Sequence, residues 1–526
     1  MIDTIITARL YSRHTGHIAQ GGIAIRQGKI VAVGAASEIT PLASAQTHIH
    51  HIDSTQLLLP GFVDSHQHLL SYVRERSERI ALWQVTSFDQ LAHALNTAAQ
   101  QLAVGQWIIG AGHDQGRYHE QRHPHRSELD VMIPDHPVLI HRACNHIALA
   151  NSQALALAGI TAQTPDPVGG RIGRDADGAP NGVLEESAVA LVRAVVQKPA
   201  IDWQLGIARA MPEYHKRGIT AIGEAALGHI NGIDDLHVMQ QAKQSGNLSL
   251  RVAYMGYGAV ANAWLTGQHL ITADAWQQAP IIKFFSDGTL GGGSAWMSAD
   301  YRDEPGNRGY PLYSDSDLTV AFTRAHCQGY QIAVHVIGDE AVAQALRCFA
   351  AVLAKYPRYN HRHRLEHCES LRPGLAAQCA QLGIVVGVQP IFTWFEESDV
   401  ARIPEPLMPY AHAWKTLHDA GAVLAFGSDN PVVPDFHPLK GIAAAVTRQT
   451  WRGDVINPHE ALAWHTAIDA YTYGAAYSLQ AEQRYGDLRR GLCADFVVID
   501  DNPALSLDQH QVIETWINGK RVLGDF

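Results

Sequence analysis

The chain has 526 residues, of which 46% are hydrophobic and 17% charged, and its formal net charge is −11. This length predicts a large barrel with accessory parts, or two to three domains. The acidic balance, without a basic stripe, argues against nucleic acid or an anionic membrane as a partner.

No apolar run approaches the roughly 18 residues that a membrane-spanning helix needs, and the first residues lack the basic and apolar regions of a signal peptide. The six cysteines form no CxxC pair. This pattern predicts reduced thiols and a cytoplasmic location.

Short alternating segments at both ends of the chain predict strands. At the C-terminal end, Asn518-Gly519 between two such segments is a strong hairpin signal. The predicted strands are Thr4–Leu10, Gly22–Arg26, Lys29–Val33, Gln46–His51, Ala494–Ile499, Val512–Trp516 and Lys520–Leu523. We expect residues 1–57 and 483–526 to pair into one small β-sandwich domain.

Between the two ends, apolar strands alternate with segments of helical periodicity such as Asp339–Tyr356. Eight strands in this rhythm predict a parallel (β/α)8 barrel over residues 58–482. A doubly wound sheet is the alternative, but no glycine-rich phosphate loop follows any strand. The predicted strands are Phe62–His66, Ile219–Ala225, Leu250–Met255, Ile281–Ser286, Gln331–Val336, Arg364–His367, Ile384–Gln389 and Val423–Gly427.

Residues 70–215 interrupt this rhythm, because one strand-to-strand connection needs far fewer residues. We interpret them as an inserted subdomain with strands at Trp107–Ala111 and Pro137–His141. Within it, the Gly/Asp/Pro-rich stretch 164–182 predicts a long loop or hairpin. Loops this long in compact domains are usually functional or disordered.

Metal-ligating residue types stand at the ends of the predicted barrel strands. His66 and His68 lie two apart, so their side chains share one face of the first strand. Four other strands carry Lys283, His335, His367 and Asp429 at or near their ends. Active sites of such barrels lie at the C-terminal face of the strands, and four histidines with one aspartate suit Zn²⁺ or another divalent first-row metal.

The chain resembles the amidohydrolase superfamily, and within it the YtcJ-like (amidohydrolase 3) branch that includes N-substituted formamide deformylases. The resemblance covers nearly the whole chain. It rests on PGFVDSHQH, IIKFFSDGTLGGGSAWM, HVIGDEA, RLEHC, VQP, FGSDNPV and GDLRRGLCADFVVID, and extends into the insert through GHDQGRY, LDVMIPDHPV, CNHIALANSQAL and PVGGRIGRDADGAPNGVLEE. The fold that it implies agrees with the barrel and sandwich predicted above.

The resemblance also implies a ligand set for one or two metal ions. His66, His68 and Asp429 would bind one ion, and His335 and His367 a second. Lys283 would bridge them as a carboxylated lysine, because an unmodified ammonium has no acceptor atom. If the CO2-derived carbamate is absent, Lys283 would act electrostatically at a site with one ion.

Two carboxylates, Glu185 and Glu224, are alternative ligands. Glu224 stands where relatives often have His-Asp, which leaves its role open.

The expected activity is hydrolysis of a non-peptide, amide-like C–N bond in a small molecule. Water bound to the metal would attack as hydroxide, and Asp429 would act as general base and then general acid. Candidate substrate-binding residues are His146, Asn151, Trp296, Gln389 and Trp394. Instead of binding substrate, Asn151 could cap the helix that follows it, and both tryptophans could pack in the core. Glycines 291–293 would let a loop bend over the pocket.

Other histidine clusters lie away from the predicted strand ends, and we interpret them as surface histidines. They are His48, His50 and His51, then His119, His123 and His125, then His361 and His363.

Two rival functions remain open on the sequence alone. One is an isomerase, lyase or esterase on the same scaffold. The other is a non-catalytic binding barrel, against which the complete ligand set argues. We expect a small molecule as the partner, and a homodimer through the insert or the barrel helices is compatible with the sequence.

Overall fold

The computed structural model describes residues 2–524 except 143–146, 168–169, 198–199, 269–270, 272–273, 275, 277–279, 396 and 502–505. The chain divides into two compact units. The first combines Met1–Ser71 with Ile207–Phe526, and the second is Tyr72–Gly206.

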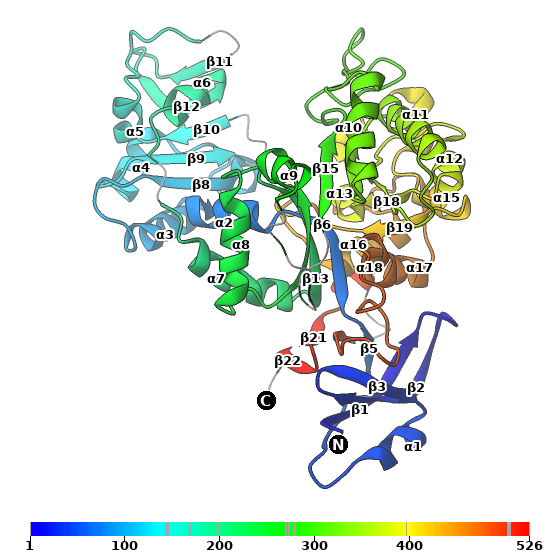
Figure 1. The fold of residues 1–526 in the computed structure, drawn as a ribbon. Coiled ribbons are helices and arrows are strands. Elements are labelled where there is room, and N and C mark those ends of the chain that lie inside the picture. Colours follow the sequence, from blue (N-terminus) through cyan, green and yellow to red (C-terminus); the bar gives the residue numbers. More distant parts are fainter. Residues whose placement is uncertain are drawn as a thin grey trace. The chain divides into compact units, whose positions relative to one another are not determined.

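A sheet of eight parallel strands forms the centre of the first unit (Figure 1). Its order follows the chain from one edge to the other. The strands are β6 (Phe62–Gln67), β13 (Ile219–Leu227), β14 (Arg251–Gly256), β15 (Ile281–Phe285), β16 (Gln331–Val336), β17 (Arg364–His367), β18 (Val385–Val388) and β19 (Val423–Phe426). Each lies within two residues of a predicted strand at both of its ends, so the predicted barrel strands are confirmed.

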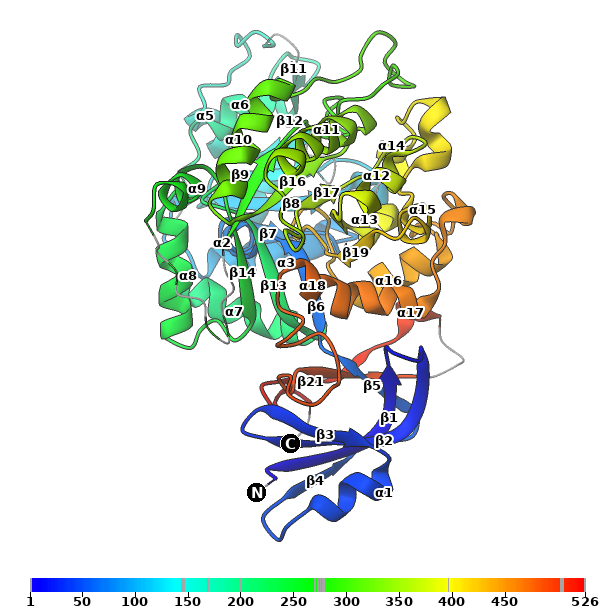
Figure 2. The same cartoon turned by 45° about the vertical axis from the view of Figure 1, so that its right-hand side comes forward.

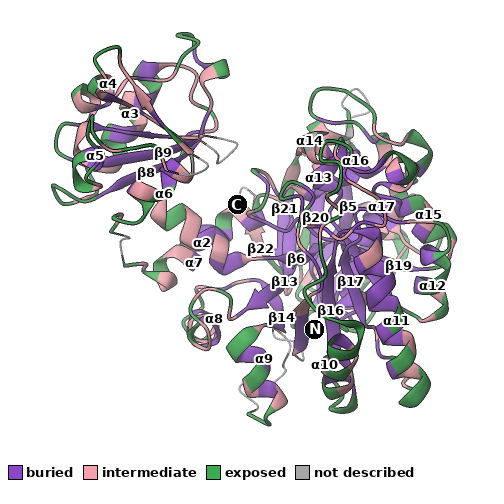
Figure 3. Cartoon of the chain, turned by 90° about the horizontal axis from the view of Figure 1, so that it is seen from above, coloured by how far each residue is buried: buried purple, intermediate pink, exposed green. Residues whose placement is uncertain are grey.

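Nearly every residue of these strands is buried, as Figure 3 shows. Burial on both faces is typical of parallel sheets covered by helices. The helices of this unit are α7 (Trp203–His215), α8 (Asp234–Gln244), α9 (Gly258–Leu265), α10 (Asp315–Cys327), α11 (Asp339–Lys355), α12 (Leu375–Gln381), α13 (Pro390–Phe395), α14 (Glu397–Val400), α15 (Trp414–Asp419), α16 (Pro438–Thr447), α17 (Trp464–Asp469) and α18 (Ala475–Ser478).

The first and last strands approach each other and nearly close the barrel. No ladder joins β6 to β19 in the described residues, but the segments that follow them are hydrogen-bonded. Asp429 N donates to His66 O at 2.7 Å, and His68 N donates to Asn430 O at 2.8 Å. Beneath these bonds, the buried Asp64 carboxylate accepts from Ser428 N at 2.9 Å and from Ser428 Oγ at 2.5 Å.

Strands from both ends of the chain share a second sheet (Figure 2). At its centre β5 pairs with β20. Ile6, Leu58, Phe496 and Trp516 belong to one buried cluster beside it. The order is β22-β21-β20-β5-β1-β2-β3, with β4 on β1. The strands are β1 (Thr4–Ser12), β2 (His17–Arg26), β3 (Lys29–Gly34), β4 (His48–His51), β5 (Gln56–Pro60), β20 (Phe496–Asp500), β21 (Val512–Ile517) and β22 (Lys520–Leu523), with helix α1 (Ala36–Ile39). The sandwich arrangement and the limits 1–57 and 483–526 stay predictions.

The second unit is built on a sheet of order β11-β12-β10-β9-β8-β7. Its strands are β7 (Ile80–Ala81), β8 (Ile108–His113), β9 (Val138–Arg142), β10 (Ile147–Ala150), β11 (Gly170–Arg174) and β12 (Pro180–Glu186). Its helices are α3 (Phe88–Ala99), α4 (Arg126–Met132), α5 (Ser152–Leu157) and α6 (Ser187–Arg193), and helix α2 (Leu69–Glu78) runs into it from the first unit. Part of the glycine-rich stretch forms the antiparallel hairpin β11–β12.

Within the described residues, no helix combines the length and the apolar character needed to cross a membrane. The cytoplasmic location stays a prediction.

Candidate metal centre

Strand β6 delivers His66 to the end of the barrel. His66 is 1% exposed, and His68 follows two positions later with its side chain 20% exposed. The two rings meet edge to face, with centroids 5.7 Å apart. The predicted sharing of one side by these histidines is therefore confirmed.

Asp429 joins them from the last strand. It follows β19 with a left-handed φ of 57°, and its amide is tied to the His66 carbonyl. This backbone places Asp429 Oδ1 at 2.9 Å from His68 Nε2 and 3.5 Å from His66 Nε2. One ligand atom from each of the three residues lies within 4.8 Å of the others.

Lys283 from β15, His335 from β16 and His367 from β17 complete the cluster. Lys283 Nζ lies 3.4 Å from His66 Nε2. The His367 ring lies with its centroid 4.9 Å from that of His66 and 4.5 Å from that of His335. The six side chains predicted from the sequence are therefore brought together at one end of the barrel.

An unusual backbone conformation turns His367 into this cluster. Successive side chains of a strand point to opposite faces, and its neighbour Glu366 already faces the barrel interior, where it contacts His66. His367 has a φ of 78°, a region that non-glycine residues seldom adopt. The left-handed turn brings two consecutive side chains to the same side.

In three buried histidines of the cluster, an acceptor holds one ring nitrogen. His66 Nδ1 lies 2.7 Å from Glu366 Oε2, His367 Nδ1 lies 2.9 Å from Gln389 Oε1, and His335 Nε2 lies 2.9 Å from Gly288 O. A carboxylate or carbonyl oxygen accepts only, so the facing nitrogen carries the proton. The lone pairs left over are on His66 Nε2, His367 Nε2 and His335 Nδ1, which is the state that a metal ion requires.

Burial favours neutral His66 and His335, whereas contact with Asp429 raises the pKa of His68 against the opposing effect of burial. Burial lowers the pKa of His66 and of His335 to about 4 each. Burial alone would raise the pKa of Asp429, but the neighbouring His66 and His68 hold it well below its usual range. Burial lowers the pKa of Lys283 to about 8, opposed by the charges of Glu366 and Asp429.

These side chains fit a divalent metal ion. Asp429 Oδ1 is buried without a well-oriented hydrogen bond from any described residue, although His68 Nε2 lies within 2.9 Å. A buried carboxylate oxygen in this state is costly unless a cation or donor satisfies it. Imidazole nitrogens with carboxylate oxygen are the ligands of Zn²⁺ and related ions.

Glu366 is a site residue that the sequence analysis missed. It is fully buried, and Arg364 binds it through Nε at 2.6 Å from Oε1. A Cβ added at Gly387 would lie 2.4 Å from Glu366 Oε2, so the glycine leaves room for the carboxylate. The available signal was a charged residue next to the ligand in RLEHC.

Asp287 was missed as well. It follows β15, and its carboxylate accepts from the backbone amides of Trp296, Ile337 and Gly338 at 2.9–3.0 Å. These bonds fix the loop after β16 next to His335, whose Nε2 lies 3.7 Å from Asp287 Oδ1.

The two alternative carboxylates are engaged elsewhere. Glu224 accepts from Gln67 Nε2 at 2.9 Å and from Leu69 N at 2.7 Å, at the N-terminus of α2. Glu185 pairs with Arg171 inside the second unit, at 2.5 and 2.8 Å. These hydrogen bonds of the two carboxylates go to residues outside the histidine cluster.

Two predicted substrate contacts belong to the second unit. Asn151 is fully buried, and its side chain caps α5 by accepting from Ala154 N, accepts from Val138 N and donates to His136 O. Asn151 therefore has the structural role of a helix cap, which was the alternative to substrate binding. His146 lies outside the described residues.

Both candidate tryptophans are half-buried. Trp296 lies in the loop after β15, and its backbone bonds to Asp287 and Glu340. Trp394 lies on α13 and packs against the cluster of Ile391, Phe392 and Val433. Their substrate contacts stay predictions.

The surface interpretation of two histidines was wrong. His361 is 4% exposed and His363 is not exposed, because they precede β17 at the opposite end of the barrel from the cluster and pack there against neighbouring helices. In the second unit, His123 is half-buried, with Nδ1 at 2.9 Å from His113 Nε2.

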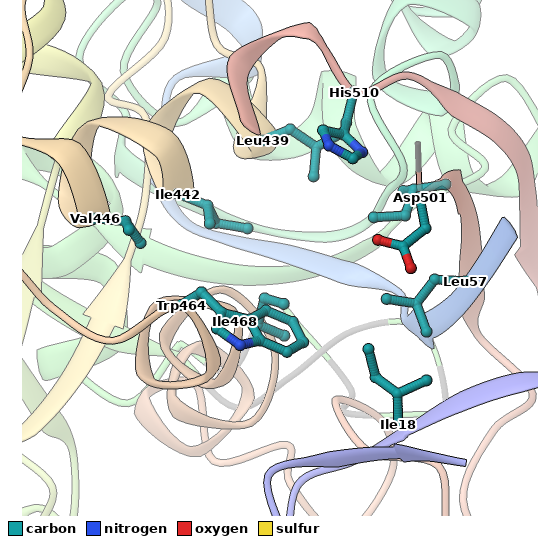
Figure 4. Close-up of a pocket in the computed structure, with 10 residues that line it drawn as sticks. Ile18, Leu57, Leu439, Ile442, Val446, Trp464, Ile468, Asp501 and His510 are labelled. Carbon is teal, nitrogen blue, oxygen red and sulfur yellow. The ribbon is translucent and has the colours of Figure 1, made fainter. Parts of the chain in front are cut away.

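A cavity of about 390 Å³ lies apart from the histidine cluster, between the shared sheet and helices α16 and α17 (Figure 4). Its lining is mostly apolar: Ile18, Leu57, Leu439, Ile442, Val446, Trp464, Ile468, Ile499, Asp501 and His510. None of these is a residue of the cluster, so the cavity is not the place of its chemistry.

Comparison with known proteins agrees with this geometry. The amidohydrolase family matches residues 56–523. YtcJ of Bacillus subtilis (strain 168), which is named as an amidohydrolase, is 32% identical over 480 residues, 89% of each chain. The N-substituted formamide deformylase of Arthrobacter pascens is 25% identical over 548 aligned residues, covering 98% of this chain and 97% of the deformylase.

A solved structure of an uncharacterized metal-dependent hydrolase from Pyrococcus horikoshii OT3 superposes with a TM-score of 0.75 at 25% identity. The match covers 96% of this chain and 99% of that one. The chain therefore belongs to the amidohydrolase family of hydrolases.

Proposed function

We propose that this protein is a metal-dependent hydrolase that cleaves a non-peptide, amide-like C–N bond of a small molecule. The observation that carries the proposal is the convergence of His66, Lys283, His367 and Asp429 at one barrel end. Three histidines there each keep one unprotonated ring nitrogen, because acceptors hold the opposite ring nitrogens, and Lys283 Nζ faces the one on His66.

His66, His68 and Asp429 would hold one ion, most readily Zn²⁺, and His335 and His367 a second. A bound divalent ion supplies Lewis acidity and lowers the pKa of a water ligand to roughly 7. Lys283, carboxylated by CO2, would offer two oxygens that share one negative charge to the two groups of ligands. Its position, with Nζ 3.4 Å from His66 Nε2, supports this role.

Asp429 would take the proton of the attacking water and return it to the leaving nitrogen. Two features support this role: its Oδ1 is buried without a well-oriented donor, and His68 lies against the same oxygen. A carboxylate in this position can accept a proton during attack and donate it during C–N cleavage.

An apolar substituent on the substrate fits the surroundings of the cluster. The Phe285 ring lies 5.1 Å from the His335 ring, and the Phe392 ring is stacked 6.4 Å from the His367 ring. Trp394 packs against the cluster that contains Phe392. The relative named as an N-substituted formamide deformylase supports small N-substituted amides as the substrate class.

Metal analysis of the purified protein, followed by a panel of N-formyl, N-acyl and cyclic amides, tests the activity. In metal-loaded Asp429→Asn protein we expect kcat to fall by about 10²- to 10⁴-fold, because the proton acceptor is lost. The exposed Asp419→Asn variant is the control and should keep wild-type turnover. Undiminished turnover by Asp429→Asn at full metal occupancy would rule out its role in proton transfer.

The modification of Lys283 has its own test. Protein loaded with metal in ¹³C-bicarbonate should show a carbamate carbon signal by NMR, and Lys283→Gln should lack it. If wild-type protein binds metal but shows no such signal, Lys283 acts as an amine and the bridging role is wrong.

A further inference from the structure

The side chain of Gln389 combines a fixed acceptor with an unused donor. Gln389 follows β18 and is 3% exposed. Gly387, two residues earlier, faces the barrel interior, because a Cβ there would meet Glu366 Oε2. By strand alternation Gln389 lies on the same face, at the level of the histidine cluster.

The acceptor end of this amide is committed to a ligand. Gln389 Oε1 accepts from His367 Nδ1 at 2.9 Å, and Asp429 Oδ2 lies 3.9 Å from the same nitrogen. If His367 binds metal through Nε2, its Nδ1 carries the proton, so the oxygen of the amide must face it. This bond fixes which end of Gln389 is oxygen and which is nitrogen.

The donor end is left without a partner. Gln389 Nε2 is buried and makes no hydrogen bond to any described residue. Buried amide donors are nearly always satisfied, so a group that arrives from solution is the fitting partner. That group must be a hydrogen-bond acceptor. It must also approach Gln389 Nε2, which belongs to the side chain bonded to His367.

We propose that Gln389 Nε2 donates to the carbonyl oxygen of the substrate, while Oε1 keeps His367 in its ligating orientation. This inference rests on the proposed amide hydrolysis. The carbonyl oxygen gains negative charge as the carbon becomes tetrahedral, and a preorganised neutral donor stabilises that charge more than the starting carbonyl. Gln389 is thus assigned to catalysis through Nε2 and to positioning through Oε1.

Two substitutions separate these roles in the full-length, metal-loaded protein. Gln389→Glu keeps an acceptor for His367 and removes the N–H groups. Metal affinity should therefore be at least that of wild type, because a carboxylate makes His367 a stronger ligand, while kcat falls by about 10²- to 10³-fold. Gln389→Met removes both the acceptor for His367 and the N–H donors, so it should also weaken metal binding by about 10- to 100-fold. A purely orienting residue would leave kcat of Gln389→Glu at the wild-type value, and that result would overturn the proposal.

A binding measurement tests the donor without relying on turnover. Methylphosphonate carries tetrahedral anionic oxygens, and calorimetry at saturating metal should show it binding at least about tenfold more weakly to Gln389→Met than to wild type. Both side chains are uncharged and metal is saturating in both proteins, so neither a change of charge nor a loss of metal accounts for the difference. Equal methylphosphonate affinities would overturn the proposal. If the tenfold difference in affinity is found but no amide is hydrolysed, only the proposed reaction is rejected.

Discussion

Two residues with left-handed backbone orient the cluster, although neither is a glycine. His367 has a φ of 78° and Asp429 a φ of 57°, and each stands directly at or just after the end of a strand. Such conformations cost of order 1–3 kcal/mol and persist only where surrounding contacts hold them. Here those contacts include the His66 carbonyl, which binds the Asp429 amide.

Glu366 is predicted to support metal binding through His66. The Glu366→Gln variant replaces an anionic acceptor by a neutral amide, so His66 becomes a weaker ligand. We expect metal affinity to fall by about 10- to 100-fold, as measured by competition with a chromophoric chelator.

Glu482→Gln is the matched control for this variant. Glu482 also pairs with an arginine, Arg362, at 2.7 Å, but it contacts none of the ligands in the described structure. Its metal affinity should equal that of wild type. An unchanged affinity in Glu366→Gln would show that His66 needs no carboxylate to orient it.

At the scale of elements, a chain of buried histidines joins β16, β17 and the helices around them. His363 Nδ1 accepts from Ile332 N at 3.0 Å, so its Nε2 donates to His326 Nδ1 at 2.8 Å. His326 Nε2 in turn donates to Tyr356 O at 2.8 Å. His361 Nε2 donates to Leu382 O at 2.9 Å, and its Nδ1 accepts from His363 N. Every ring nitrogen is used, and only neutral rings satisfy this arrangement.

This histidine chain predicts a loss of stability in acid. Burial lowers the pKa of His361 to about 4, whereas the unfolded chain has a histidine pKa of about 6.5. The unfolded state therefore binds more protons between these values. The contribution of buried His361 to stability is therefore complete above about pH 6.5 and is lost as the pH falls toward 4.

The His361→Asn variant should reduce the pH dependence of the unfolding free energy in this range. We expect a slope smaller by up to about 1.4 kcal/mol per pH unit, measured by urea unfolding between pH 4.5 and 7.5. The exposed His418→Asn should keep the wild-type slope. Identical slopes for His361→Asn and wild type would contradict the assigned burial.

At the scale of the whole molecule, a buried ion pair ties the shared sheet to the barrel. Arg251 of β14 binds Asp495 through Nε at 2.5 Å and Nη2 at 2.9 Å, and both side chains are at most 1% exposed. Asp495 also accepts from Asn518 N. Two segments of the C-terminal end and a barrel strand thus meet at one carboxylate.

Removing one partner of this pair leaves the other charge buried. We expect Asp495→Asn to lower the free energy of unfolding by about 3–5 kcal/mol, as measured by denaturant titration. The exposed pair of Lys415 and Asp419 provides the comparison, because Asp419→Asn should cost less than about 1 kcal/mol. A loss that small in Asp495→Asn would mean that water reaches the buried arginine.

The sequence by itself determined the barrel strands and the residue types at their ends. Parallel strands in a barrel are buried on both faces, so they read as short apolar runs, and their carboxyl ends necessarily meet. His66, His68, Lys283, His335, His367 and Asp429 could therefore be grouped from their positions at strand ends.

Only the tertiary structure decided how these residues are held. Glu366 meets His66 across 300 positions of chain, and neither the inward turn of His367 nor the unused donor of Gln389 follows from any local periodicity. The sequence also did not indicate that His361 and His363 are buried. Hydrophobic patterns report which face of an element is apolar, whereas hydrogen-bond partners depend on which distant segments the fold brings into contact.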